Sequence, residues 1–178
     1  SDNSTNNELQ EILITDFPSV ETIFWNPGYS SFFDHFNKIV SLIKTKYITI
    51  FHDDDALEPD YVKRILEEFR ALPNAAAIGT NATYAHLSGN KTIMKSNGTQ
   101  VFNNKIAILE QYLRTDAGGV TAFSSHAYNL EMIKDLLHLD YARGSDMCDT
   151  LMLMDLIDIG PIVWIDEPLV EVNVEHEH

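Results

Sequence analysis

The sequence contains little cysteine, few basic residues and no long apolar run, and each shortage excludes a class of protein. The single cysteine among 178 residues rules out an internal disulfide bond and a zinc site made of several thiolates. One cysteine is also typical of a reducing compartment, so we expect a cytoplasmic location. The 12 Lys and Arg against 27 Asp and Glu give a formal net charge of −15, which argues against a nucleic-acid partner and against direct docking on anionic lipid. No run of about 18 apolar residues occurs, which predicts that no segment spans a membrane.

Apolar strands and amphipathic helices alternate along the first half of the chain. Residues 21–25 and 47–51 are predicted strands, and a helix capped by Ser30 or Ser31 is predicted between them. A second helix begins near Pro59, and residues 75–80 form a third predicted strand. This β-α-β-α-β order is typical of parallel strands joined by crossover helices. We therefore predict an α/β fold with a mixed, mostly parallel sheet flanked by helices.

The rest of the chain is less regular but is compatible with one folded unit. The other predicted elements are helices at residues 8–14, 103–113 and 130–139, an acidic turn followed by an apolar helix within 145–159, and strands at 91–95, 162–165 and 169–174. With 44% hydrophobic residues, the chain is long enough to bury one sizeable core. We expect residues 1–178 to form a single domain.

Three consecutive carboxylates, Asp53, Asp54 and Asp55, follow the predicted strand at residues 47–51. The carboxyl edge of the strands is where open α/β sheets bind ligands. Like charges about 4 Å apart repel by roughly 4 kcal/mol at an effective dielectric constant near 20, so a cation is needed to neutralise them. Carboxylates suit hard ions such as Mg²⁺ and Mn²⁺, which commonly carry a phosphate ligand. The alternative interpretation is a solvated loop that caps the next helix.

The beginning of the chain is unusual for such a fold. A mononucleotide-binding α/β half normally opens with a strong apolar strand, whereas residues 1–5 are turn-forming residues. We therefore expect an N-terminally truncated domain that lacks its first βαβ unit.

The order of these motifs resembles the family 2 glycosyltransferases, which have the GT-A fold. The resemblance rests on Asp2-Asn3-Ser4-Thr5, on Asn26-x-Gly28-Tyr29-Ser30, on the strand followed by His52-Asp53-Asp54-Asp55-x-Leu57-x-Pro59-Asp60, on Asp149 before an apolar helix and Gly160, and on Ile165-Asp166-Glu167-Pro168-Leu169. It implies transfer of a sugar from a nucleotide diphosphate sugar to an acceptor hydroxyl, with inversion. It also implies a glycan or lipid-linked acceptor, a role in surface glycan or polysaccharide synthesis, and attachment to the inner membrane surface through parts outside this chain.

The resemblance assigns roles within the acidic segment through the D-x-D motif of the family. Aligned on Pro59-Asp60, the motif covers residues 52–54, where His52 replaces the usual first aspartate. Asp54 is then the ligand of Mn²⁺ or Mg²⁺, and Asp53 contacts the ribose. Asp55 supports the site without binding the ion.

The resemblance also implies a carboxylate that acts as the catalytic base at the start of a late helix. In the family this residue lies about 11 positions before a glycine, and counting back from Gly160 gives Asp149. Asp146, three residues earlier, is the rival. A third interpretation of Asp149 is that its side chain only caps the helix.

Further donor and metal contacts are implied at positions with weaker motifs. Asn26 and Gly28 match a donor-site segment of the family, and Gly118-Gly119 would let the backbone approach a sugar closely, unless it is a plain turn. The family has a metal-binding histidine after its last strand, and His176 is the nearest candidate, although it could belong to a terminal tail or tag.

Two other functions stay open at this stage. A nucleotidyltransferase also needs carboxylates, a metal ion and a nucleotide. A non-catalytic module that binds sugar or metal would keep the acidic segment without using it for transfer. Metal-dependent nucleotide binding distinguishes the enzymes from such a module.

Overall fold

The computed structural model describes residues 1, 6–25, 28, 31–52, 54–93, 95, 98–113 and 123–173. The helices are α1 (Glu8–Asp16), α2 (Phe32–Leu42), α3 (Tyr61–Ala71), α4 (Lys105–Leu113), α5 (Leu130–Ile133), α6 (Tyr141–Gly144) and α7 (Cys148–Leu156), with short 3-10 turns η1 (Phe123–Ser125) and η2 (Ser145–Met147). The strands are β1 (Tyr47–Thr49), β2 (Ala56–Leu57), β3 (Ala77–Ala85), β4 (Lys91–Ile93), β5 (Gln100–Phe102), β6 (Ala127–Asn129) and β7 (Ile162–Asn173).

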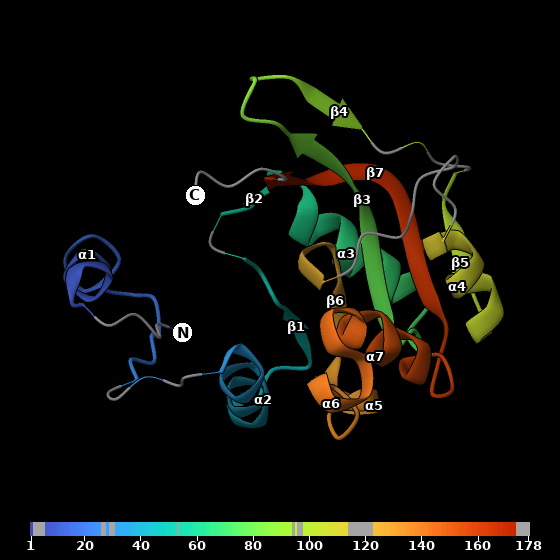
Figure 1. Cartoon of the computed structure of the whole chain (residues 1–178), viewed down its shortest axis with the longest axis horizontal. Helices are drawn as coiled ribbons and strands as arrows, with labels where there is room; N and C mark the ends of the chain where they lie inside the picture. The colour runs from blue at the N-terminus through green and yellow to red at the C-terminus, as the bar shows by residue number, and fades with distance from the viewer. Residues whose placement is uncertain are drawn as a thin grey trace.

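One sheet organises the fold, with the strand order β1-β6-β3-β7-β2 (Figure 1). The long strands β3 and β7 form its centre and run parallel to each other. The other described pairings, including those of β4 with β3 and of β5 with β7, are antiparallel. The expectation of a mostly parallel sheet is therefore wrong. The strands β1, β3 and β7 do share one direction, but the antiparallel strand β6 is inserted between β1 and β3.

Helices pack on both faces of the sheet because neighbouring strand residues point to opposite sides. On one face, α3 packs through Tyr61, Ile65 and Phe69 against alternate strand residues such as Ile78 and Val163. On the other face, α2, α4, α5 and α7 share a core with the intervening strand positions; its members include Phe36, Ile108, Leu130, Met152, Leu156 and Trp164. The prediction of an α/β sheet flanked by helices is confirmed.

Several element boundaries differ from those predicted. Residues 21–25 form no strand and contain only a single bridged residue, Phe24. The two strands expected after residue 162 are one strand, β7, which continues through Pro168. Proline cannot donate a ladder hydrogen bond, and the register of β3 and β7 shifts on both sides of Asn81, the residue opposite Pro168, so that this bond is not needed. The predicted helix at residues 130–139 ends at Ile133. The short strand β2, which the sequence did not predict, separates the acidic segment from α3.

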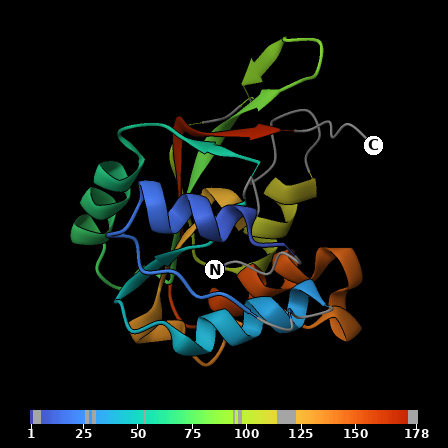
Figure 2. The same ribbon diagram turned by 90° about the vertical axis from the view of Figure 1, so that its left-hand side faces the viewer.

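Helix α1 differs from the others because it buries none of its residues. It stands apart from the sheet on the side of β1 in Figure 1, and Figure 2 shows it from that side, in front of the sheet. Helix α2 begins as predicted at a serine cap, with the Ser31 hydroxyl accepting a hydrogen bond from the backbone N–H of Asp34. Among the described residues, no helix has both the length and the apolar character that a bilayer crossing requires.

The imidazole of His126 is buried directly against the central strand. Its Nδ1 lies 3.1 Å from the Ser125 hydroxyl, while its Nε2 has no hydrogen-bond partner. A Cβ atom at Gly79 would lie 2.4 Å from that Nε2, so only glycine at this position of β3 leaves room for the ring. Burial lowers the pKa of His126 to about 4.

This buried imidazole predicts a specific loss of stability in acid. The neutral ring is retained in the folded state down to about pH 4, whereas the unfolded chain takes up a proton near the ordinary pKa of 6.5. Stability should therefore fall as the pH drops from 6.5 to 4, by about 3 kcal/mol. Denaturant unfolding of the wild type and of His126→Gln at pH 7 and pH 4.5 measures this. Equal pH slopes in the two proteins would contradict it.

Candidate functional site

The acidic segment lies between β1 and β2, at the carboxyl end of β1. One ligand atom from each of His52, Asp54 and Asp55 lies within 4.8 Å of the other two. Asp53 lies outside the described residues. The structure therefore brings Asp54 and Asp55 together as the sequence predicted, and it adds His52 to the cluster.

Asp55 is the most buried member of this cluster. Its side chain is only 2% exposed, and its Oδ1 accepts a hydrogen bond from the backbone N–H of Asn173 at 3.2 Å. Its Oδ2 is buried without a hydrogen-bond partner and lies 3.8 Å from Nδ1 of His52. A buried carboxylate oxygen that accepts no hydrogen bond costs free energy, and a cation beside it would lower that cost.

Asn173, at the end of β7, fixes this segment from the opposite end of the chain. Besides the backbone bond to Asp55, its side-chain amide donates to the carbonyl oxygen of Asp54. Strand β2 also pairs with β7, which brings the acidic segment beside it. No local sequence pattern indicates this role, because Asn173 lies 118 residues from Asp55 along the chain.

The role of Asn173 can be tested by Asn173→Ala, which removes the amide contact to Asp54 but keeps the backbone bond to Asp55. We expect the affinity for Mn²⁺ to fall about tenfold, a typical effect of losing a residue that orients a ligand. Calorimetric titration measures the change, and Asn90→Ala, in the β3–β4 turn, is the matched control. Equal affinities of the two variants would contradict this role.

Asp149 lies in the first turn of α7, in a half-buried position. Its Oδ1 accepts a hydrogen bond from the backbone N–H of Thr150 at 2.7 Å. Burial raises the pKa of Asp149, and hydrogen bonds from Thr150 and the charge of His52 oppose this only in part. The N-cap residue of α7 is Met147, so the interpretation of Asp149 as the helix cap is wrong.

Tyr128, on β6, belongs to the same electrostatic neighbourhood. Burial raises the pKa of its phenol, and the charge of Asp149 adds to the shift. Its hydroxyl is buried without a hydrogen-bond partner. Asp149 is thus close enough to both His52 and Tyr128 to interact with them electrostatically. Sequence reasoning missed Tyr128, which is one aromatic residue in a strand of only three residues.

The other predicted site residues are less well defined. Asp146 lies in η2, directly after Ser145, whose φ of 50° is in the left-handed region, but its side chain is outside the described structure. Gly28 is exposed. The remaining predicted contacts, Asn26, Gly118, Gly119 and His176, lie outside the described residues.

Gly160 has a structural reason to be glycine. A Cβ atom there would lie 2.4 Å from the carbonyl oxygen of Asn74, so only glycine allows the chain to pass between α7 and β7 at this point. The spacing from Asp149 to Gly160 thus runs from the first turn of α7 to the connection that leads into β7.

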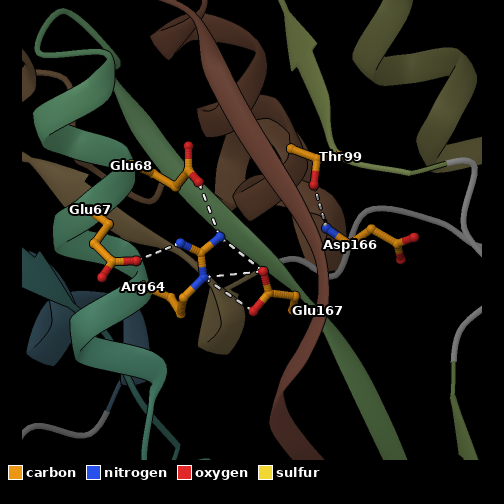
Figure 3. A network of polar contacts seen from close by, with 6 residues as sticks. All are labelled: Arg64, Glu67, Glu68, Thr99, Asp166 and Glu167. Atoms are coloured by element: carbon orange, nitrogen blue, oxygen red, sulfur yellow. Dashed lines mark hydrogen bonds and ion pairs between the residues drawn. The ribbon is translucent and has the colours of Figure 1, made fainter.

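A charged network joins α3 to β7 (Figure 3). Nε of Arg64 donates to both carboxylate oxygens of Glu167 at 3.1 Å, and its other nitrogens bind Glu67 at 2.6 Å and Glu68 at 3.2 Å. Beside it, the backbone N–H of Asp166 donates to the Thr99 hydroxyl. These contacts hold the part of β7 where its register with β3 shifts, so Arg64 has a structural role.

The fold, with the acidic segment at the end of β1, is that of a GT-A-type domain, and the comparisons agree with this class. The model of glycosyl transferase family 2 matches residues 1–137, so the chain belongs to this family. The fold is similar to the crystal structure of S. aureus TarS 1-349 in complex with UDP-GlcNAc, with a TM-score of 0.72 and 11% sequence identity. The match covers 98% of this chain and 48% of that chain, so this chain spans about half the length of its structural relative. No curated protein sequence matches it. The resemblance read from the sequence motifs is confirmed.

Proposed function

We propose that this domain transfers a sugar from a nucleotide diphosphate sugar, bound together with a divalent metal ion, to an acceptor hydroxyl group. The observation that carries the proposal is the buried Oδ2 of Asp55, which accepts no hydrogen bond and lies beside His52 and Asp54. Membership of the glycosyl transferase family supports the reaction class. The complex of the structural relative with UDP-GlcNAc supports a uridine diphosphate sugar as the donor.

The residues at the end of β1 fit a divalent ion. A carboxylate oxygen without a partner, a second carboxylate and an imidazole offer the donor atoms that Mn²⁺ accepts. His52, Asp54 and Asp55 would hold the ion, which when bound would supply the positive charge that stabilises the diphosphate leaving group. Asn173 would keep the loop that carries these side chains in place.

Asp149 would accept the proton of the attacking acceptor hydroxyl. The raised pKa makes this carboxylate a stronger base than an exposed aspartate, and its hydrogen bond from Thr150 orients it. Direct attack of the acceptor on the anomeric carbon, without a covalent enzyme intermediate, would invert the configuration of that carbon. The acceptor would be a glycan or a lipid-linked glycan in surface polysaccharide synthesis.

Release of UDP from UDP-sugar donors tests this proposal. The chain is incubated with Mn²⁺, a panel of UDP-hexoses and hydroxyl-bearing glycan acceptors, and free UDP is measured. We expect release that depends on both the metal ion and the acceptor. Metal binding that is indifferent to the nucleotide would instead favour a non-catalytic binding module.

A further inference from the structure

Three aromatic side chains gather at the surface where the start of α2 meets α6 (Figure 1). The ring centroid of Phe33 lies 4.8 Å from that of Tyr141 and 5.6 Å from that of Phe32. Phe32 is 53% exposed and Tyr141 is 50% exposed, whereas Phe33 is half-buried and packs on the core. Exposed apolar side chains that lie in contact with one another, with polar residues around them, are typical of a binding surface. We call these three residues the aromatic patch.

The helices that carry the aromatic patch are tied together by a pair of hydrogen bonds. The side-chain amide of Asn37, on α2, donates to the carbonyl oxygen of Leu139 at 3.0 Å, and its side-chain oxygen accepts from the backbone N–H of Leu139 at 2.9 Å. Leu139 lies in the segment that leads into α6. The two helices therefore present their rings in a fixed arrangement, and such a preorganised surface loses little conformational entropy when a ligand binds.

The aromatic patch lies close to Asp149, the proposed base. The backbone N–H of Ser145 donates to the carbonyl oxygen of Tyr141, which closes α6 directly before η2 and α7. A Cβ atom at Gly144 would lie 3.0 Å from Cβ of Cys148, the residue before Asp149, so the end of α6 touches the first turn of α7. The four residues from Ser145 to Asp149 span about 6–8 Å at a helical rise. A short glycan that lies on the aromatic patch would thus reach Asp149.

We infer that the aromatic patch binds a sugar ring of the acceptor, and that this acceptor is an uncharged glycan. The inference rests on the proposed function, because it names the class of acceptor whose hydroxyl group Asp149 would deprotonate. A pyranose ring has a face of C–H groups that packs on aromatic side chains, whereas its hydroxyl groups project sideways and need polar partners.

The charges around the rings favour an uncharged sugar over an anionic one. Asp34, on α2, and Asp140, directly before α6, are next to the aromatic patch in the chain, and both are exposed. Carboxylate oxygens accept hydrogen bonds from sugar hydroxyls, and they repel phosphate and carboxylate groups. The guanidinium of Arg143, on α6, is bound by the carboxylate of Asp155, and the chain has a formal net charge of −15. An anionic glycan and an anionic lipid surface are therefore disfavoured as ligands of the aromatic patch.

Saturation-transfer NMR tests the inference without relying on turnover. The full chain is mixed with cellobiose, an uncharged disaccharide, and saturation transferred from the protein to the sugar protons is recorded. We expect transfer to the ring C–H protons in the wild type, its loss in Phe32→Ala and Tyr141→Ala, and its retention in Tyr141→Phe, which keeps the ring. Phe17→Ala is the matched control, because Phe17 is also 53% exposed. No transfer in the wild type, or equal transfer in Phe32→Ala and Phe17→Ala, would overturn the inference.

The same NMR experiment distinguishes an uncharged sugar from an anionic ligand. Digalacturonic acid, an anionic disaccharide, should show no transfer from the wild type. Transfer to it that is lost in Phe32→Ala would contradict the inferred class of acceptor. Vesicles containing phosphatidylglycerol that bind the wild type but not Phe32→Ala would assign the aromatic patch to a lipid surface and would also overturn the inference.

Steady-state kinetics separates the failure of the inference from the failure of the proposed function. With an acceptor that supports UDP release, Phe32→Ala should raise KM for the acceptor about tenfold and leave kcat within about twofold of the wild type, because the ring contributes to binding and not to the chemical step. The affinity for UDP should not change. An unchanged acceptor KM, or a loss of UDP affinity, would overturn the inference alone. If no acceptor supports UDP release, the proposed function fails and the inference fails with it.

Discussion

Replacing Asp149 by asparagine is expected to reduce sugar transfer by about 10²–10⁴-fold, the usual contribution of a general base. Asparagine keeps an oxygen that can accept the hydrogen bond from Thr150, but it cannot take up the proton of the acceptor. Donor binding should stay near the wild-type value, because Asp149 is not part of the cluster at residues 52–55. Initial rates of UDP release, with calorimetric titration of UDP in the presence of Mn²⁺, measure the two effects separately.

The same substitution should stabilise the fold slightly. Burial raises the pKa of Asp149, so its ionisation costs stability at every pH above that raised value, and the cost disappears once the pH falls below the ordinary value of 3.8. The melting temperature of Asp149→Asn should therefore exceed that of the wild type at pH 7, with the difference vanishing as the pH falls below 3.8. Asp158→Asn, on the exposed segment after α7, is the control. Transfer that survives in Asp149→Asn but is lost in Asp146→Asn would identify Asp146 as the base.

Replacing Asp54 by alanine has the second large expected effect. The variant should lose metal-dependent UDP binding, with a decrease in Mn²⁺ affinity of about 100-fold, because two of the proposed ligands cannot compensate for the third. The fold should be unaffected, since the contact from Asn173 goes to the backbone carbonyl of Asp54 and not to its side chain. Calorimetric titration of Mn²⁺ with and without UDP measures this loss.

Asp60→Asn is the matched control for this experiment. Asp60 is an exposed aspartate in the same connection, directly before α3, and its side chain makes no capping hydrogen bond. It should bind Mn²⁺ and UDP like the wild type. Normal metal-dependent binding in Asp54→Ala would place the metal site elsewhere.

Local sequence signals predicted the elements that depend on local interactions. The Ser31 cap, the proline before α3 and the spacing from Asp149 to Gly160 all mark elements that the structure contains. The strand pairing was less predictable, because the insertion of β6 between β1 and β3 depends on contacts between segments some 80 residues apart. A three-residue strand such as β6 has too short a pattern to reveal its direction.

The same limit applies to the candidate site. The acidic run after β1 is visible in the sequence, and so is a carboxylate at the start of α7. Asp55 is buried and contacts His52 and Asn173 because β7 pairs with β2. No local sequence pattern predicts that pairing. The sequence therefore predicted where acidic side chains gather, whereas the burial and the contacts of each side chain required the fold.

The most direct test of the account is the location of Mn²⁺ in crystals of this chain soaked with MnCl₂ and UDP. Anomalous scattering identifies the ion independently of the model used for phasing. We expect one strong anomalous peak in contact with the carboxylate of Asp54 and with the diphosphate of UDP. UDP bound without an ion beside Asp54, or an ion bound at another place with the diphosphate, would contradict the account.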